Sequence, residues 1–209
     1  MTQVFPTQTR RTGGHQRVRM SYEEFLEWDG ENQHVEWVDG EVIPMPPITG
    51  AHNDAGNYLI RLFGAFLDYH SIGVLRTDPF QMKTGPALPG RAPDLMFIAR
   101  RNLRRLQARF LDGPADLVVE IISPGSQTVD RVHKFREYEQ GGVREYWLIN
   151  PARRQAEFYR RGRDGRFHLV TIGEDRIYHS VAMKGLWINV EWLWDCPPIG
   201  TVLREWGIV

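Results

Sequence analysis

The segment from Leu117 to Ile122 constrains the fold most, because it is an unbroken apolar run, rich in β-branched residues, that contains one charged residue, Glu120. Runs of this length and composition are typical of a strand buried on both faces of a sheet. A carboxylate in such a strand is costly unless it pairs with a cation or binds a metal ion. The run therefore predicts a central strand whose carboxylate needs a partner. A functional site and a buried salt bridge to an arginine both meet that need.

The residues after this strand predict an α/β fold. A helix is expected over residues 127–140, where Gly141-Gly142 ends it, and a second buried strand over residues 145–149. Strand, helix and strand in succession, preceded by antiparallel strands, indicate a mixed β-sheet core flanked by helices, with additional β-strands.

Further elements follow from apolar periodicity and turn signals. Ser21 is expected to cap a helix that reaches Trp28, and Asp39-Gly40 is expected to turn a hairpin. The other expected segments are the hairpin strands 34–38 and 41–45, a long helix over 51–69, extended pieces at 72–76 and 80–83, a strand at 95–98, an irregular or helical stretch at 100–111, and strands at 156–159, 167–171, 177–180 and 186–190.

Length and composition predict one domain, residues 21–209, behind a flexible N-terminal tail, residues 1–20. No apolar run approaches the ~20 residues of a membrane helix, and no hydrophobic stretch follows the basic N-terminal residues, so neither a membrane span nor a secretory signal is expected. The single cysteine, Cys196, excludes an internal disulfide and the usual zinc clusters. A cytoplasmic protein is the expectation.

The formal net charge of zero argues against a protein that coats nucleic acid by charge alone. Local patches still leave room for an enzyme that acts on nucleic acid. Arginines gather at residues 100–109 and 153–166. They form either basic patches for nucleic acid or ordinary solvated surface beside acidic residues. Tryptophans gather near the C-terminus, either as core or as the surface of a homodimer (Trp187, Trp192, Trp194 and Trp206).

Four further residues stand out, each with a structural and a functional interpretation. Asp94 follows Pro93 at the start of an apolar strand, where it is either a turn residue or a ligand. Lys134 lies four residues after Asp130 on one helix face, as a surface pair or as a cation that reaches Glu120. Glu36 has apolar neighbours in its strand. His52 opens the long helix, as a polar cap or as part of an anion site.

Together these residues offer two or three carboxylates and a lysine. Carboxylate oxygens suit Mg²⁺ or Mn²⁺, which commonly bind one or two carboxylates together with water and substrate phosphate. Such an ion stabilises negative charge on phosphorus and generates a nucleophile from water, and a nearby lysine can steady either group. The sequence lacks a Gly-x-Ser-x-Gly elbow, a P-loop and a dinucleotide fingerprint. The set therefore favours phosphodiester hydrolysis.

Several segments in a fixed order resemble a known family. They are Val35 to Glu41, His52 at a helix start, Ala92-Pro93-Asp94-Leu95, Asp116 to Ser126, Asp130 with Lys134, and Gly142 to Pro151. The chain resembles the Uma-type family of restriction endonucleases, within the PD-(D/E)XK nuclease superfamily, from about Tyr22 to Tyr159 or further. The resemblance implies a restriction-endonuclease-like fold and a Mg²⁺-dependent endonuclease with DNA as substrate; Mn²⁺ is expected to substitute for Mg²⁺.

The superfamily pattern also assigns roles. Asp94 matches the proline–aspartate half and Glu120 the acidic position of the second half, and both are implied as metal ligands. Isoleucine stands at Ile122, where the pattern has lysine, so the resemblance implies that Lys134 supplies the catalytic cation from the next helix. Glu36 and His52 would complete the site. The alternative is a catalytically inactive binding or regulatory protein on a nuclease scaffold.

Overall fold

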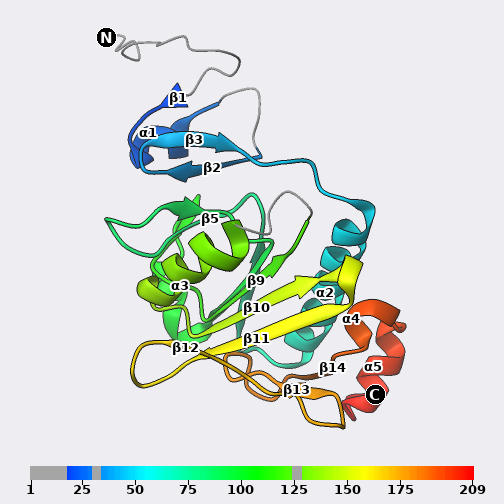
Figure 1. Ribbon diagram of the computed structural model, residues 1–209. Coiled ribbons are helices and arrows are strands. Elements are labelled where there is room, and N and C mark those ends of the chain that lie inside the picture. Colours follow the sequence, from blue (N-terminus) through cyan, green and yellow to red (C-terminus); the bar gives the residue numbers. More distant parts are fainter. Residues whose placement is uncertain (1–17, 30–33, 124–128) are drawn as a thin grey trace.

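A six-stranded mixed sheet forms the centre of the computed structural model, which describes residues 18–29, 34–123 and 129–209 (Figure 1). Its strand order is β12-β11-β10-β9-β7-β4. The strands are β4 Gly73–Thr77, β7 Leu95–Ala99, β9 Leu117–Ile121, β10 Glu145–Asn150, β11 Gln155–Arg161 and β12 Phe167–Leu169. β9 and β10 are parallel, and the other neighbours are antiparallel.

The two central strands confirm the interpretation of the apolar runs. Every residue of β9 and β10 is buried. Side chains alternate along a strand, so Glu120 shares a face with Val118 and not with Val119. Val118 belongs to one hydrophobic cluster and Val119 to the other, which places Glu120 on the Val118 side of the sheet.

A different helix covers each face of this sheet. α2, Gly50–Tyr69, packs Leu59, Leu62 and Phe63 into the cluster that contains Val119. On the other face lie a π-helical turn, η2 Val129–Lys134, and the α-helix that continues it, α3 Phe135–Gly141. Tyr138 of α3 belongs to the cluster that contains Val118. Glu120 therefore faces the η2–α3 helix.

A second six-stranded sheet carries the N-terminal hairpin, drawn in blue at one end of the molecule in Figure 1. Its order is β1-β3-β2-β6-β5-β8, with β1 Val18–Arg19, β3 Glu41–Pro44, β2 Val35–Val38, β6 Gly90–Arg91, β5 Gln81–Lys83 and β8 Phe110–Asp112. The hairpin turn at Asp39-Gly40 has φ values of 50° and 83°, the positive angles that a type I′ turn needs. Ser21 and Glu24 form a capping box on α1, Tyr22–Glu27.

Several local expectations need correction. The stretch 100–111 begins with the expected helical turns, a 3₁₀ helix, η1 Arg100–Arg105, but strand β8, which starts at Phe110, was not predicted. Of the helix expected over 127–140, residues 127 and 128 lie outside the described part, and its first described turn is π-helical. Residues 1–17 of the expected tail also lie outside the described part, whereas Val18–Arg19 forms β1.

The C-terminal region forms a layer beside α2. β13 Ile177–His179 and β14 Trp187–Asn189 form a two-stranded sheet, and the unpredicted helices α4 Trp192–Asp195 and α5 Ile199–Glu205 follow. Another short 3₁₀ helix, η3 Pro151–Arg153, follows β10. Trp192, Trp194 and Trp206 are partly buried against the core cluster, and the Trp206 ring lies 5.4 Å from that of Phe66. These three side chains are therefore core; the homodimer stays a prediction.

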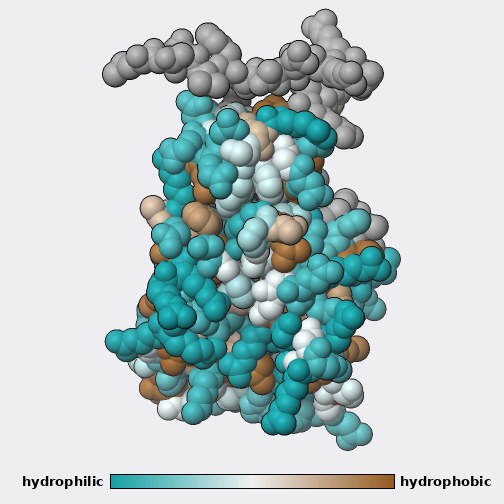
Figure 2. Space-filling model, turned by 90° about the vertical axis from the view of Figure 1, so that its left-hand side faces the viewer, coloured by the Kyte–Doolittle hydropathy of each residue, from teal (hydrophilic) through white to brown (hydrophobic). Residues whose placement is uncertain are grey.

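The arginine clusters lie beside acidic side chains. Arg101 pairs with Asp116, and Arg166 Nη1 lies 2.9 Å from Oε2 of Glu139. Hydrophilic residues predominate on the face shown in Figure 2, where hydrophobic residues form only small, separate spots. None of the described helices combines the length and the apolar character that crossing a membrane requires.

Candidate functional site

Asp94 and Glu120 meet at one edge of the central sheet. Leu95 at the start of β7 lies opposite Val119 near the end of β9, so the residue before β7 and the end of β9 are neighbours. Oδ2 of Asp94 accepts a hydrogen bond from the backbone N–H of Ile121 at 2.6 Å, which fixes this carboxylate against β9. Both acids line one small cavity, together with His52, Asp78 and Lys134 among other residues; we call it the carboxylate cavity.

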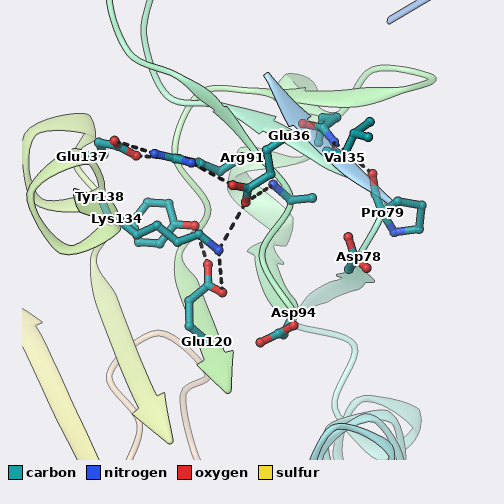
Figure 3. A network of polar contacts seen from close by, with 12 residues as sticks. Val35, Glu36, Asp78, Pro79, Arg91, Asp94, Glu120, Lys134, Glu137 and Tyr138 are labelled. Atoms are coloured by element: carbon teal, nitrogen blue, oxygen red, sulfur yellow. Dashed lines mark hydrogen bonds and ion pairs between the residues drawn. The ribbon is translucent and has the colours of Figure 1, made fainter. Parts of the chain in front are cut away.

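Lys134 enters this cavity from the helix on the Glu120 face. Its Nζ atom lies 3.0 Å from Oε2 of Glu120 and 3.2 Å from Oε1 of Glu36. Figure 3 shows the Lys134 side chain between these two carboxylates. The side chain is 2% exposed, so the interpretation of Lys134 as part of a surface pair is wrong. The side chain of Asp130 lies outside the described residues.

Tyr138 holds the second oxygen of Glu120. It lies one helical turn after Lys134 on the same face, and its hydroxyl donates a hydrogen bond of 2.6 Å to Oε1 of Glu120. Burial, followed by the negative charges of Glu120 and Glu36, raises the pKa of Tyr138 well above its usual range. The hydroxyl therefore keeps its proton and remains a donor to Glu120.

Glu36 lies behind Lys134, in a buried set of charges. Arg91 Nη1 donates to Oε2 of Glu36 at 2.7 Å, and two further nitrogens of Arg91 donate to both oxygens of Glu137 at 2.7 Å each. Burial alone would raise the pKa of Glu36, but the charges of Lys134 and Arg91 outweigh it and lower that pKa. Glu36 is not among the described residues that line the carboxylate cavity, so it contacts the cavity through Lys134.

His52 contacts Asp94 from the first turn of α2. Thr49 caps α2, and its hydroxyl accepts a hydrogen bond from the backbone N–H of His52 at 3.2 Å. This cap sets the first turn of α2, from which Nε2 of His52 lies 3.2 Å from Oδ1 of Asp94. Of the five residues predicted for the site, His52, Asp94, Glu120 and Lys134 thus line one cavity, and Glu36 pairs with Lys134.

Asp78 is a cavity residue that the sequence analysis missed. It follows β4, whose last residue, Thr77, lies opposite Leu95, so Asp78 lies beside Asp94 (Figure 3). His34 Nε2 lies 2.8 Å from Oδ2 of Asp78. Burial raises the pKa of Asp78, the charges of Asp94 and Glu36 add to this, and His34 opposes it. The sequence did hold a signal for Asp78. This aspartate follows an extended segment, much as Asp94 directly precedes a strand.

Arg91 and Tyr138 were also missed as members of the site. Arg91 stands three residues before Asp94, in the stretch Arg91-Ala92-Pro93-Asp94, and is only 5% exposed. Tyr138 lies four residues after Lys134, which is the spacing of one helix face. These spacings were the signals that could have placed both residues near the cavity.

The donor set fits a divalent ion of the Mg²⁺ type. Hard carboxylate oxygens from Asp94 and Glu120 border the same cavity; burial and then the negative charges of Asp94 and Glu36 raise the pKa of Asp78 there, and a cation would offset those charges. Across the described ranges, no group of three or more His, Cys, Asp or Glu side chains is arranged to hold a metal. Mg²⁺ commonly binds one or two carboxylates and completes its coordination with water, so Asp94 and Glu120 fit such an ion.

Comparisons with known proteins support the fold. The fold resembles the crystal structure of a "putative nuclease belonging to DUF820" from Anabaena variabilis, with a TM-score of 0.70 and 16% sequence identity. That likeness covers 84% of this chain and 98% of the other. An uncharacterized protein of Synechocystis, slr1290, is 26% identical over 149 residues, which cover 70% of this chain and 77% of that protein.

A family match extends over most of the chain. The Uma2 family, described as "Putative restriction endonuclease", matches residues 22–191. The matched range includes Glu36, Asp94, Glu120 and Lys134, as well as both strands that form the sheet edge. The nuclease-like fold expected from the resemblance is therefore confirmed, and the chain belongs to the Uma2 family.

Proposed function

We propose that this protein is a Mg²⁺-dependent endonuclease that hydrolyses DNA phosphodiester bonds and that accepts Mn²⁺ in place of Mg²⁺. The observation that supports it most is the 3.0 Å approach of Lys134 Nζ to Glu120, inside the cavity that Asp94 also lines. An acid and a lysine are thus adjacent although the strand position two residues after Glu120 holds Ile122.

Asp94 and Glu120 are the proposed metal ligands. Mg²⁺ at this position would supply stabilisation of negative charge at the scissile phosphate and activation of the attacking water. The hydrogen bond from Ile121 N–H and the contact with His52 keep the Asp94 carboxylate turned toward the cavity. Tyr138 does the same for Glu120. Two pre-positioned carboxylates lose little conformational freedom when they bind an ion.

Lys134 is the proposed catalytic cation. Its ammonium group faces the carboxylates of Glu120 and Glu36, which stabilise the positive charge. Arg91 neutralises the other oxygen of Glu36 and is itself held by Glu137, so the Lys134 ammonium has a fixed position beside Glu120. A fixed cation near the reacting phosphate stabilises the charge that develops in the transition state.

Nicking of supercoiled plasmid DNA tests the proposal. The parent protein is expected to nick the plasmid with Mg²⁺ or Mn²⁺ and to leave it intact with EDTA. Glu120→Gln, purified in the same way, is expected to be inactive with either metal, which excludes a contaminating nuclease. Equal nicking with EDTA and with Mg²⁺ would contradict metal dependence.

A catalytically inactive binding protein on this scaffold is the second candidate. It is favoured by Ile122 at the strand position and by the hydrogen bonds that Tyr138 and Lys134 make to both oxygens of Glu120. For this candidate, the parent would bind the plasmid and leave it intact with every metal tested.

A further inference from the structure

A second and larger cavity adjoins the carboxylate cavity. It encloses about 800 Å³ between the N-terminal helix α1, the β4–β5 segment and Ile60 of α2. Asp78 lines both cavities, so a group bound in the larger one lies next to the proposed metal site. A volume of this size suits a nucleotide-sized ligand.

Aromatic side chains line this second cavity, which we call the aromatic cavity. Phe25 and Trp28 come from α1 and the residue after it, and Phe80 comes from the turn before β5. Phe25 is buried, whereas Trp28 and Phe80 are half-buried, so part of each of the latter rings is accessible. Flat aromatic surfaces in a cavity stack favourably on planar ligands, and nucleobases are such ligands.

Gln81 is a buried polar residue in the wall of the aromatic cavity. The residue is 6% exposed and lines the aromatic cavity. Its Nε2 donates to the carbonyls of Val35 at 3.2 Å and Pro79 at 3.4 Å, both visible in Figure 3. Those two carbonyls assign the amide orientation, and they leave Oε1 buried without a donor among the described residues. Because Oε1 has almost no accessible surface, Gln81 forms part of the cavity wall and ties it to β2, and its oxygen does not face a ligand.

Two arginines supply positive charge at the same cavity. Arg76 lies over the Phe80 ring, with Cζ 5.6 Å from the ring centroid, and Arg109 is 55% exposed and forms a surface ion pair of 2.9 Å with Glu27. Guanidinium groups bind phosphate well because they combine charge with several N–H donors. Aromatic rings and arginines together match a nucleotide, because the rings can stack on the base and the arginines carry charge that suits the phosphate backbone.

We infer that the aromatic cavity binds one unpaired nucleobase of the nucleic-acid substrate, stacked on its aromatic side chains. Enzymes that hold an extruded base also stack it between aromatic or apolar side chains. The inference rests on the proposed function for the identity of the ligand as DNA. It narrows the substrate to DNA that presents an unpaired base near the scissile phosphate, such as a bulge or a single-stranded junction.

Fluorescence anisotropy in EDTA tests this inference without cleavage. The probes are two labelled hairpin duplexes of the same sequence, one fully matched and one with a single bulged nucleotide. The parent is expected to bind the bulged duplex about tenfold more tightly, the scale of stacking one base on an aromatic side chain. Equal dissociation constants for the two duplexes would overturn the inference.

Two variants locate the effect, and a third is the control. Ile60→Trp fills the cavity from a residue that is already 39% exposed, and Phe80→Leu removes a ring with little loss of volume. Each is expected to reduce the tenfold preference to about twofold or less. Leu169→Trp adds the same indole at an exposed residue of β12 and is expected to keep the preference. Retention of the preference in folded Ile60→Trp and folded Phe80→Leu would also overturn the inference.

Plasmid nicking by the same parent preparation separates this inference from the proposed function. Mg²⁺-dependent nicking without preference for the bulge refutes the nucleobase cavity and leaves the endonuclease proposal standing. Preference for the bulge without nicking refutes the endonuclease proposal and supports the nucleobase cavity.

Discussion

Nζ of Lys134 lies 3.0 Å from Oε2 of Glu120, although the two residues are 14 positions apart and come from different elements. Glu120 points from β9 toward the helix that follows it, and Lys134 ends the π-helical turn of that helix. Ile122, two residues after Glu120, is buried in the cluster on the same face of the sheet. The helix thus supplies the cation that the strand lacks.

Replacement of Lys134 by methionine should destabilise the protein. Glu120 and Glu36 would then face each other without the cation between them, and loss of one partner of a buried ion pair costs roughly 3–5 kcal/mol. Urea unfolding at about pH 7, with EDTA present, measures the change in the free energy of unfolding. Lys184→Met, at an exposed lysine, is the control. Equal stability of Lys134→Met and the parent would contradict the claim that Lys134 stabilises the fold through its ion pairs with Glu120 and Glu36.

The Glu36 carboxyl should make stability depend on pH. Its pKa is lowered in the folded state, so its ionised form stabilises the fold above the unfolded pKa of about 4.3, and this contribution disappears as pH falls through the lower folded value. The difference in unfolding free energy between the parent and Glu36→Gln should therefore be largest near neutral pH and shrink below about pH 4. Glu23→Gln, at an exposed residue of α1, should show little difference at any pH. A pH-independent difference for Glu36→Gln would refute a lowered pKa of Glu36 in the folded state.

Removal of the Tyr138 hydroxyl should also weaken the fold. Tyr138→Phe keeps the ring in the core and loses the 2.6 Å hydrogen bond to Glu120, which costs roughly 1.5–3 kcal/mol for a bond to a charged group. Urea unfolding in EDTA measures it. Tyr69→Phe, at an exposed tyrosine of α2, is expected to stay within about 0.5 kcal/mol of the parent. A similarly small effect for Tyr138→Phe would mean that the hydrogen bond is not important for stability.

Calorimetric titration with Mn²⁺ should detect one site that needs both acids. Asp94→Asn and Glu120→Gln are each expected to lose the binding heat, because each removes a charged ligand from a site of two carboxylates. Asp68→Asn changes an exposed carboxylate on α2 and is expected to bind like the parent. Parent-like binding by Asp94→Asn and by Glu120→Gln would exclude the proposed ligands.

The central strands could be predicted because their own residues, without long-range contacts, indicate a buried strand. Leu117 to Ile121 form a strand buried on both faces, and the apolar run alone indicates this. Alternation along β9 also fixes the face on which Glu120 lies. The sequence further places Lys134 in the helix that follows this strand, from which its side chain can reach Glu120. This part of the site depends on short-range patterns and on one strand–helix–strand unit.

Contacts between distant elements could not be predicted in the same way. Arg91 and Glu137 are 46 positions apart, and their pairing depends on how the second sheet packs against α3. Asp78 joins the site only because β4 pairs with β7 in one particular register. The C-terminal helix α5 was missed for a local reason: it has seven residues, no side-chain cap, and one buried residue, Val202. Such a helix owes its stability to tertiary packing more than to its own sequence.

The plasmid-nicking rate of Lys134→Met with Mg²⁺ tests the central claim, that Glu120 and Lys134 act together in cleavage, most directly. At a temperature where circular dichroism shows the variant folded, its rate should fall roughly a hundredfold or more below that of the parent. The double variant Lys134→Met with Ile122→Lys, which places a lysine at the strand position of the superfamily pattern, should recover part of the activity. Nicking by Lys134→Met at the parent rate would contradict the joint action of these two residues.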